Sequence, residues 1–137
     1  LIIWEGININ MPGIAVKLPL TRDKQDGFSL LQSYNEVAAQ NLKMLVLTCP
    51  GERIMDPDFG VGARRYLFEL VNEETFQVFK SNLLRQQEKY LPYLAIEDVQ
   101  FISALDGTST DENFLGIRIF YYNKIFKNSG VLSLPIR

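Results

Sequence analysis

The chain has 137 residues, a mass of 15.7 kDa and a formal net charge of −2, which corresponds to one domain that can fold without disulfides or a structural metal. The sequence has no histidine and one cysteine. It therefore lacks the commonest general base, every histidine triad and the usual zinc ligands, so neither a metal nor a cofactor is expected. Lys and Arg do not gather into a track for a phosphate backbone, which excludes nucleic acid as an expected partner.

Residues 1–26 show no sustained hydrophobic period, because proline and glycine repeatedly interrupt short apolar pieces. The first of these pieces, residues 1–4, is too short for a signal-peptide core or a membrane span, so we expect no membrane insertion and synthesis in a cytoplasm. We predict an extended N-terminal arm over 1–26, followed by a single domain over 27–137. The apolar residues of the arm are expected to lie on the domain or on a neighbouring subunit.

From Phe28 onward the apolar residues follow a helical period, which predicts an amphipathic helix that ends near Leu47. The residues at this spacing are Leu31, Tyr34, Ala38, Leu42 and Leu45. A loop follows, because Pro50-Gly51, Asp56-Pro57 and Gly60 are turn residues. Residues 63–70 then predict a short helix.

Asn72 is a plausible cap for a longer helix over 73–90, which Pro92 would end. The face of this helix that we expect to be buried carries Phe76, Phe79, Leu83 and Tyr90. Three strands are predicted after it, over 96–105, 114–126 and 131–136. Residues 106–113 and 128–130 separate the strands, as in an antiparallel meander. The fold class is therefore α+β, with helices packed on one face of a small antiparallel sheet.

Alternation along 114–126 divides the middle strand into two faces. One is a continuous apolar strip that we expect to meet the helices, formed by Leu115, Ile117, Ile119, Tyr121 and Ile125. The other interleaves aromatic side chains with cations: Phe114, Arg118, Phe120, Tyr122, Lys124 and Phe126. Protein interfaces are enriched in aromatic residues and arginine, so this second face is expected to meet another protein. The alternative is that the N-terminal arm folds back and covers it.

The loop and the short helix carry a set of short motifs in a fixed order: Leu47-Thr48, Gly51-Glu52-Arg53, Pro57, Phe59-Gly60 and Leu67-Phe68-Glu69. This pattern resembles the sheath-initiator subunit of contractile phage-tail baseplates, which has counterparts in type VI secretion and other contractile injection machines. We call residues 48–60 the signature loop. The resemblance implies a structural or docking role for this region, carried by Gly51, Glu52, Arg53, Pro57, Phe59, Gly60, Phe68 and Glu69.

The resemblance also implies an assembly function rather than catalysis. The chain would be a structural component of the virion, located in the tail baseplate and assembled in the host cytoplasm. Its partners would be the sheath protein and the wedge or core-bundle proteins, with the tail tube or hub as further candidates. The sheath would be templated by the C-terminal hairpin, through Ile117, Ile119, Tyr121, Val131, Leu132 and Leu134. The sequence does not distinguish a phage from a tailocin or a secretion system.

The motifs depart from the family pattern at one point. Sheath initiators usually place Glu-Pro-Arg after a tyrosine at the end of the long helix, whereas this chain has Tyr90-Leu91-Pro92-Tyr93. The proline is retained and both charges are absent. We therefore expect these four residues to dock on the wedge proteins through apolar and aromatic contacts, or in another geometry.

Two other functions remain open at this level, a carboxylate-based lysozyme-like glycosidase and a general soluble adaptor. Members of the family have carried a lysozyme label, and Glu52, Asp56, Asp58 and Glu69 lie in or near the signature loop. A glycosidase needs a general acid with a raised pKa, and the guanidinium of Arg53 would instead lower the pKa of the adjacent Glu52. We therefore predict that the chain is not an enzyme and has no catalytic residues.

Arg53 is expected to brace the loop, because a planar guanidinium can bind several carbonyls and carboxylates at once. The candidate acceptors are Glu52, Asp56 and Glu69. The brace serves either the stability of the loop alone or a docking surface for another baseplate subunit. Phe59 and Phe68 are expected to fill the core beneath it.

Overall fold

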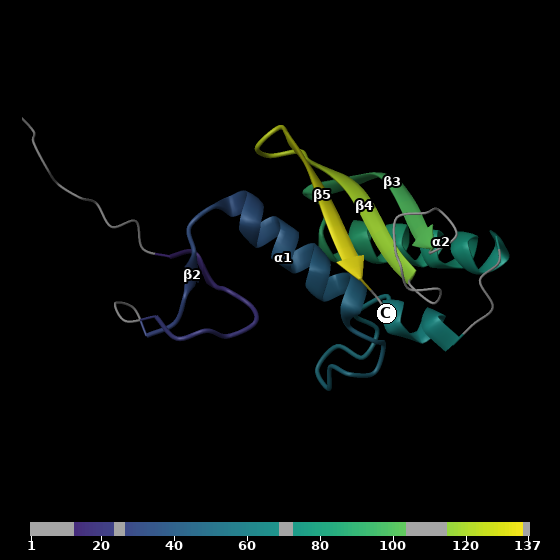
Figure 1. Cartoon of the computed structure of the whole chain (residues 1–137), viewed down its shortest axis with the longest axis horizontal. Helices are drawn as coiled ribbons and strands as arrows, with labels where there is room; N and C mark the ends of the chain where they lie inside the picture. The colour runs from purple at the N-terminus through teal and green to yellow at the C-terminus, as the bar shows by residue number, and fades with distance from the viewer. Residues whose placement is uncertain (1–12, 24–26, 69–72, 104–114, 136–137) are drawn as a thin grey trace, which may run out of the picture.

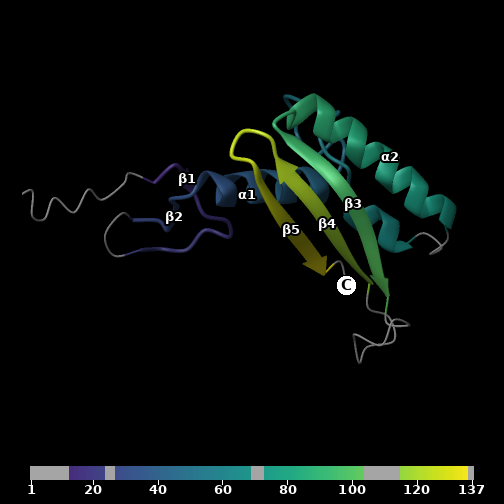
Figure 2. The same cartoon turned by 90° about the horizontal axis from the view of Figure 1, so that it is seen from above.

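The computed structural model describes residues 13–23, 27–68, 73–103 and 115–135 (Figure 1). The elements in chain order are β1 (Ala15–Val16), β2 (Leu30–Leu31), α1 (Tyr34–Leu47), the 3-10 helix η1 (Ala63–Phe68), α2 (Glu73–Tyr90), β3 (Leu94–Ser103), β4 (Leu115–Asn123) and β5 (Asn128–Pro135). Strands β3, β4 and β5 form an antiparallel sheet in that order, and β1 pairs with β2 separately. Both helices lie on the same side of the larger sheet (Figure 2). The predicted α+β class is confirmed.

Helix α1 begins later than the hydrophobic period predicted. The Ser33 side chain accepts a hydrogen bond from the Asn35 amide at 3.3 Å, as an N-cap does, so the helix starts at Tyr34. Leu30 and Leu31, which the period assigned to the helix, instead pair with β1. The helical spacing of Leu31 is therefore coincidental, because strand pairing determines its backbone. The predicted end at Leu47 agrees with the structure.

The β1–β2 ribbon was not predicted from the sequence, and one side chain of α1 attaches it to the domain. Gln40 accepts a hydrogen bond from the Leu18 amide through Oε1 and donates one to the Val16 carbonyl through Nε2, both at 2.9 Å. The described part of the predicted arm, residues 13–23, is therefore hydrogen-bonded to α1. Residues 1–12 lie outside the described residues.

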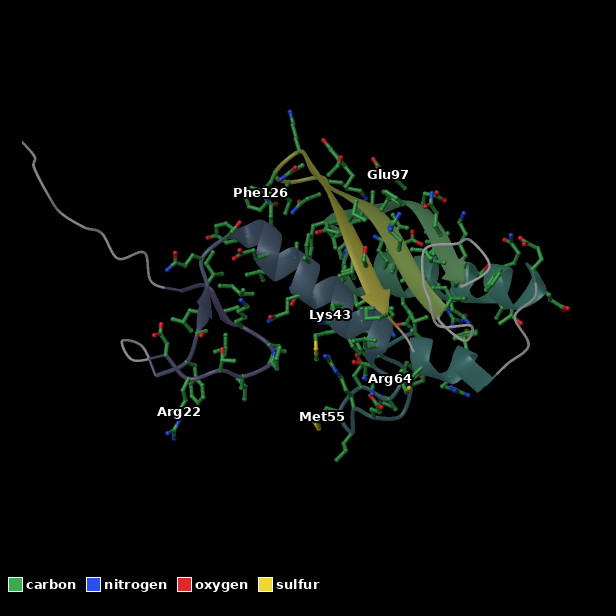
Figure 3. All side chains as sticks on the ribbon, in the orientation of Figure 1. Arg22, Lys43, Met55, Arg64, Glu97 and Phe126 are labelled. Atoms are coloured by element: carbon green, nitrogen blue, oxygen red, sulfur yellow. The ribbon has the colours of Figure 1, made fainter. Side chains whose placement is uncertain are left out.

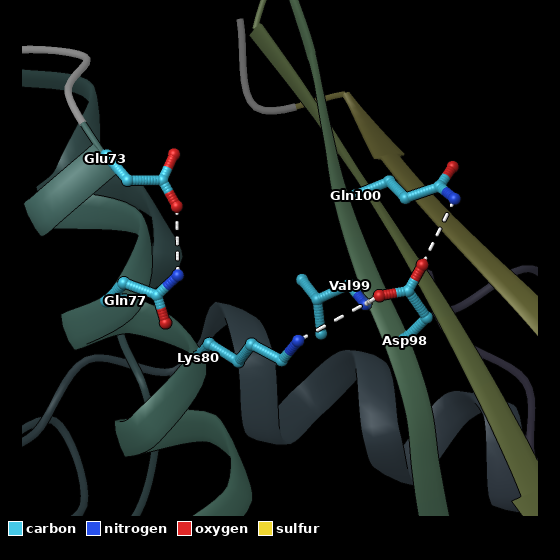
Figure 4. A network of polar contacts seen from close by, with 6 residues as sticks. All are labelled: Glu73, Gln77, Lys80, Asp98, Val99 and Gln100. Carbon is cyan, nitrogen blue, oxygen red and sulfur yellow. Dashed lines mark hydrogen bonds and ion pairs between the residues drawn. The ribbon is translucent and has the colours of Figure 1, made fainter.

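Helix α2 has the predicted bounds, and Phe79 and Leu83 are fully buried beneath the sheet. Its proposed cap, Asn72, lies outside the described residues. Beside this buried face, Lys80 forms an ion pair of 4.0 Å with Asp98 of β3 (Figure 4). Because both side chains are about half exposed to solvent, this ion pair adds little to stability. The burial of apolar side chains thus holds α2 against β3.

Strand β4 places the predicted apolar strip against the helices, with Ile117, Ile119 and Tyr121 all buried. Ile125 was assigned to the same strip, and this was wrong, because β4 ends at Asn123 and the next four residues form the turn. Asn123 sets that turn: its buried side-chain oxygen accepts hydrogen bonds from the backbone amides at 125 and 126, at 3.0 and 3.4 Å.

The predicted turn at 128–130 was also misplaced, because these residues are the start of β5. Gly130 lies directly across from Tyr121 in the sheet, and a Cβ atom at this position would collide with the tyrosine ring. Its glycine is therefore required by close approach inside a strand and not by a turn.

The core lies between the two helices and the sheet, and the chain that follows α1 contributes Phe59, Val61 and Ala63 to it. Within the described ranges, no helix is both long and apolar enough to cross a membrane.

Candidate functional site

The signature loop is closed by hydrogen bonds within its own backbone and side chains. The Gly51 amide donates to the Pro57 carbonyl at 2.8 Å and joins the two ends of the turn. The carboxylate of Glu52 accepts a hydrogen bond from the Cys49 amide at 3.0 Å. Three residues of the predicted motif, Gly51, Glu52 and Pro57, thus define the path of the loop.

Gln86 of α2, whose role was not predicted from the sequence, fastens the far end of the loop. The Gln86 side chain is 7% exposed, accepts a hydrogen bond from the Gly60 amide at 3.1 Å and donates one to the Asp58 carbonyl at 2.8 Å. A signal for it was present, because Gln86 follows the buried Leu83 by three residues and so faces the core. A polar residue on a buried helix face requires a partner, and here that partner is the loop backbone.

Gly60 is required by its position next to the end of α1. Its φ is 107°, and a Cβ atom there would collide with the Thr48 carbonyl oxygen. Any other residue would be strained and would also push the loop away from α1. This explains why the Phe59-Gly60 pair belongs to the motif.

Arg53 holds the loop in a way that differs from the predicted brace. Its guanidinium carbon lies 3.5 Å from the centre of the Phe59 ring, and within the described residues it forms no hydrogen bond or ion pair with Glu52 or Asp56. Phe59 in turn meets Tyr90 edge to face at 4.9 Å, and the Tyr90 hydroxyl donates to Asp56 at 2.9 Å. The arginine therefore covers a buried aromatic ring, a cation–π contact. Glu69 and the Phe68 side chain lie outside the described residues.

The segment proposed for wedge docking exposes less surface than its sequence suggested. Leu91 is buried in the core, and Tyr93 is half-buried with its hydroxyl accepting a hydrogen bond from Asn41 at 3.1 Å. Tyr90 is half-buried against Phe59. Pro92 is exposed.

The residues proposed for the sheath template divide between the two sides of the hairpin. Ile117, Ile119, Tyr121 and Leu134 are buried toward the helices, and Leu132 is half-buried on the same side. Val131 points the other way and is 54% exposed. It pairs with Phe120 of β4 on the face that the helices leave open. The side chains that could meet a partner are thus those of the open face.

Strand β5 ends the sheet, so its outer edge carries no partner strand among the described residues. Pro135, near the end of β5, has no amide hydrogen to donate. Proline is tolerated in sheets where its missing donor faces away from the ladder. Because backbone amides alternate in direction along a strand, those of Ser133 and Val131 share the direction of position 135 and are expected on the free edge.

A hollow of about 510 Å³ opens beside the signature loop, between η1 and α2. Its lining residues are Pro50, Asp58, Gly60, Val61, Arg65, Tyr66, Asn82, Arg85, Gln86 and Lys89. Three of them are cationic and one is a carboxylate. We call it the basic hollow. Among the residues that the structure describes, no group of three or more Cys, Asp or Glu side chains is arranged to hold a metal ion.

The family model for Baseplate wedge protein gp25 matches residues 32–124, which extend from the start of α1 to the turn after β4. No curated protein sequence matched.

Several solved structures share the fold, and three of them illustrate the likeness. A Geobacter sulfurreducens protein that carries a tail-lysozyme label is 25% identical, with a TM-score of 0.62 over 78% of this chain and 93% of that protein. A chain of the anti-feeding prophage baseplate is 24% identical, with a TM-score of 0.65 over 80% of this chain and 84% of that one. A chain of the postcontracted pyocin R2 baseplate is 18% identical, with a TM-score of 0.50 over 85% of this chain and 95% of that one.

The family match covers most of the domain, including the signature loop and α2. The predicted resemblance to contractile-tail baseplate proteins is confirmed by it. The chain belongs to the Baseplate wedge protein gp25 family and is a wedge-like structural component of the baseplate of a phage tail or related contractile machine.

Proposed function

We propose that this subunit starts sheath assembly by offering the free edge of β5 to a strand of the first sheath subunits, while the signature loop docks on wedge or core-bundle proteins. The observation that carries the proposal is the outer edge of β5, which has no partner strand among the described residues, in a sheet whose apolar side is already covered by α1 and α2. An added strand would gain main-chain hydrogen bonds without disturbing the core. The exposed Val131 and the half-buried Phe120 beside it would give that strand apolar contacts.

The tip of the signature loop supports the docking half of the proposal. Ile54 and Met55 are 95% and 96% exposed, and Met55 points away from the domain (Figure 3). The loop that presents them is held by Gln86 and by the Gly51–Pro57 hydrogen bond, so its ordering does not have to occur on binding. Two apolar side chains on a pre-ordered loop are suited to a pocket on a neighbouring protein.

The arrangement of carboxylates favours a structural role over hydrolysis. Glycosidases of the common type place two carboxyl groups on either side of the bond that they cleave. The basic hollow has one carboxylate among its described lining residues, Asp58. Glu52 is exposed and engaged with the Cys49 amide. We therefore propose that the tail-lysozyme label of the Geobacter protein does not extend to this chain as an activity.

The template proposal is tested by Ser133→Pro, which removes one expected donor from the free edge, with Ser133→Ala as the matched control. Both variants should stay folded, because position 133 is exposed and its amide is expected to face away from β4, where a strand tolerates proline. Baseplates containing Ser133→Pro should form but carry no sheath under the electron microscope. Baseplates containing Ser133→Ala should carry normal sheaths. Normal sheaths on Ser133→Pro baseplates would reject the template role.

A further inference from the structure

The basic hollow concentrates positive charge in a chain whose net charge is −2. Arg65 from η1 and Arg85 and Lys89 from α2 line it, and Asp58 is the one carboxylate among its described lining residues. All four side chains are exposed. Because cations gathered on the walls of a concave surface reinforce one another, this hollow attracts negative charge although the molecule as a whole repels it.

Its polar side chains are already ordered by one another. Asn82 donates a hydrogen bond to the Tyr66 hydroxyl at 3.1 Å and accepts one from Arg85 at 3.4 Å. Tyr66 is fixed in turn by an edge-to-face contact with the buried Phe79 at 5.2 Å. Asn82 and Tyr66 thus connect the exposed Arg85 to the core and favour one orientation of its guanidinium.

Lys89 keeps its charge at any physiological pH. Its contact with the Tyr90 side chain raises its pKa above the ordinary value, and the nearby charges of Asp56 and Asp58 act in the same direction. The lysine lies one helical turn from Arg85 on the same face of α2. The two cations therefore lie next to each other along one wall of the hollow.

We propose that the basic hollow binds an acidic peptide segment of another baseplate subunit. Arg65 and Arg85 can each hold a carboxylate through paired hydrogen bonds, and Lys89 can hold one as a point charge. A nucleic acid would need a longer basic track than these three side chains provide. The inference rests on the proposed baseplate function and names a partner chemistry for the surface beside the signature loop.

Zero-length carbodiimide cross-linking of native baseplates tests the inference directly, because this reagent joins an amine only to a carboxylate in contact with it. Peptide mass spectrometry should find Lys89 joined to an Asp or Glu of a different subunit. Lys43, exposed on α1 and outside the hollow, is the matched control lysine and should show no such link. Links from Lys89 to its own Asp56 or Asp58 alone would overturn the proposal.

A charge-reversal variant provides the second test of the basic hollow. The double variant Arg85→Glu, Lys89→Glu should lower incorporation into baseplates at least ten-fold, and Lys43→Glu should not. Exchanging the cross-linked partner carboxylate for lysine should restore incorporation of the double variant. If the double variant fails to fold, the cross-linking of the native protein decides. The inference would be overturned if the double variant melted normally and entered baseplates as well as the native protein. It would also be overturned if the native protein bound a fluorescent polyphosphate, the double variant did not, and no cross-link to another protein were found.

The two proposals fail independently. Sheath growth on Ser133→Pro subunits is scored only on baseplates that have formed, whereas the charge reversal is scored by whether the subunit enters a baseplate. A negative result at the basic hollow therefore leaves the β5 edge unaffected, and the reverse also holds.

Discussion

The signature loop and the β4–β5 hairpin are both proposed contact surfaces, but different physics holds them. The hairpin is held by many similar contacts among its inward apolar side chains, such as the contact between Ile119 and Leu132, which lie opposite each other in the sheet. The loop is held by a few unlike contacts, chiefly the two hydrogen bonds of Gln86 and the stacking of Arg53 on Phe59. The hairpin should therefore unfold only together with the whole domain, whereas the loop should be able to unfold locally.

The largest effect should come from Ile119→Ala, because Ile119 is fully buried between the sheet and the helices. The loss should be about 2 to 5 kcal/mol of unfolding free energy, measured by urea denaturation. Val131→Ala is the control on the same hairpin and should cost less than about 0.5 kcal/mol, since that side chain is exposed. Equal losses for the two variants would contradict the division of the hairpin into a buried and an open face.

Gln86→Ala should have the second-largest effect and lower the free energy of unfolding by about 1 to 3 kcal/mol, because it leaves the Gly60 amide and the Asp58 carbonyl without their partner. Its distinguishing result is local: hydrogen exchange should accelerate at Gly60 more than at the amides of β4. A uniform increase across the domain would show that the loop is not a separate unit. Gln77→Ala, on the exposed face of α2, serves as the control.

Arg53→Ala should lower the free energy of unfolding by only about 0.5 to 1 kcal/mol, because a cation–π contact at an exposed site contributes about that much. The predicted brace would instead have cost about 1 to 3 kcal/mol for each acceptor left unpaired. Arg53→Lys keeps the charge, so its unfolding free energy should lie between those of the native protein and Arg53→Ala. A loss above about 3 kcal/mol in thermal or urea melts would favour the brace.

Glu52→Gln should have the smallest effect. The amide oxygen of glutamine can still accept the hydrogen bond from Cys49, so stability should change by less than about 0.5 kcal/mol. Neither form should clear a suspension of purified peptidoglycan. Clearing by the native protein that Glu52→Gln abolishes, with its melting temperature unchanged, would establish the glycosidase alternative.

The sequence by itself determined the features that depend on neighbouring residues. Helical spacing and Pro92 located α2 with its correct bounds, and alternation identified Ile117, Ile119 and Tyr121 as the buried side of β4. Turn residues marked the signature loop, whose Gly60 has the positive φ that favours glycine. These signals are local, because a period or a turn preference is expressed within a few residues.

Only the tertiary structure decided the contacts that join distant segments. Gln40 lies 22 and 24 residues from its partners in the β1–β2 ribbon, and Gln86 lies 26 and 28 residues from its partners in the loop. The same holds for the basic hollow, whose cations come from η1 and α2. A glutamine or arginine can be satisfied by water or by many partners, so its sequence position does not name one. The packing of α2 against the loop determines the partners of a side chain there, because it removes water and leaves one set of hydrogen-bonding groups within reach.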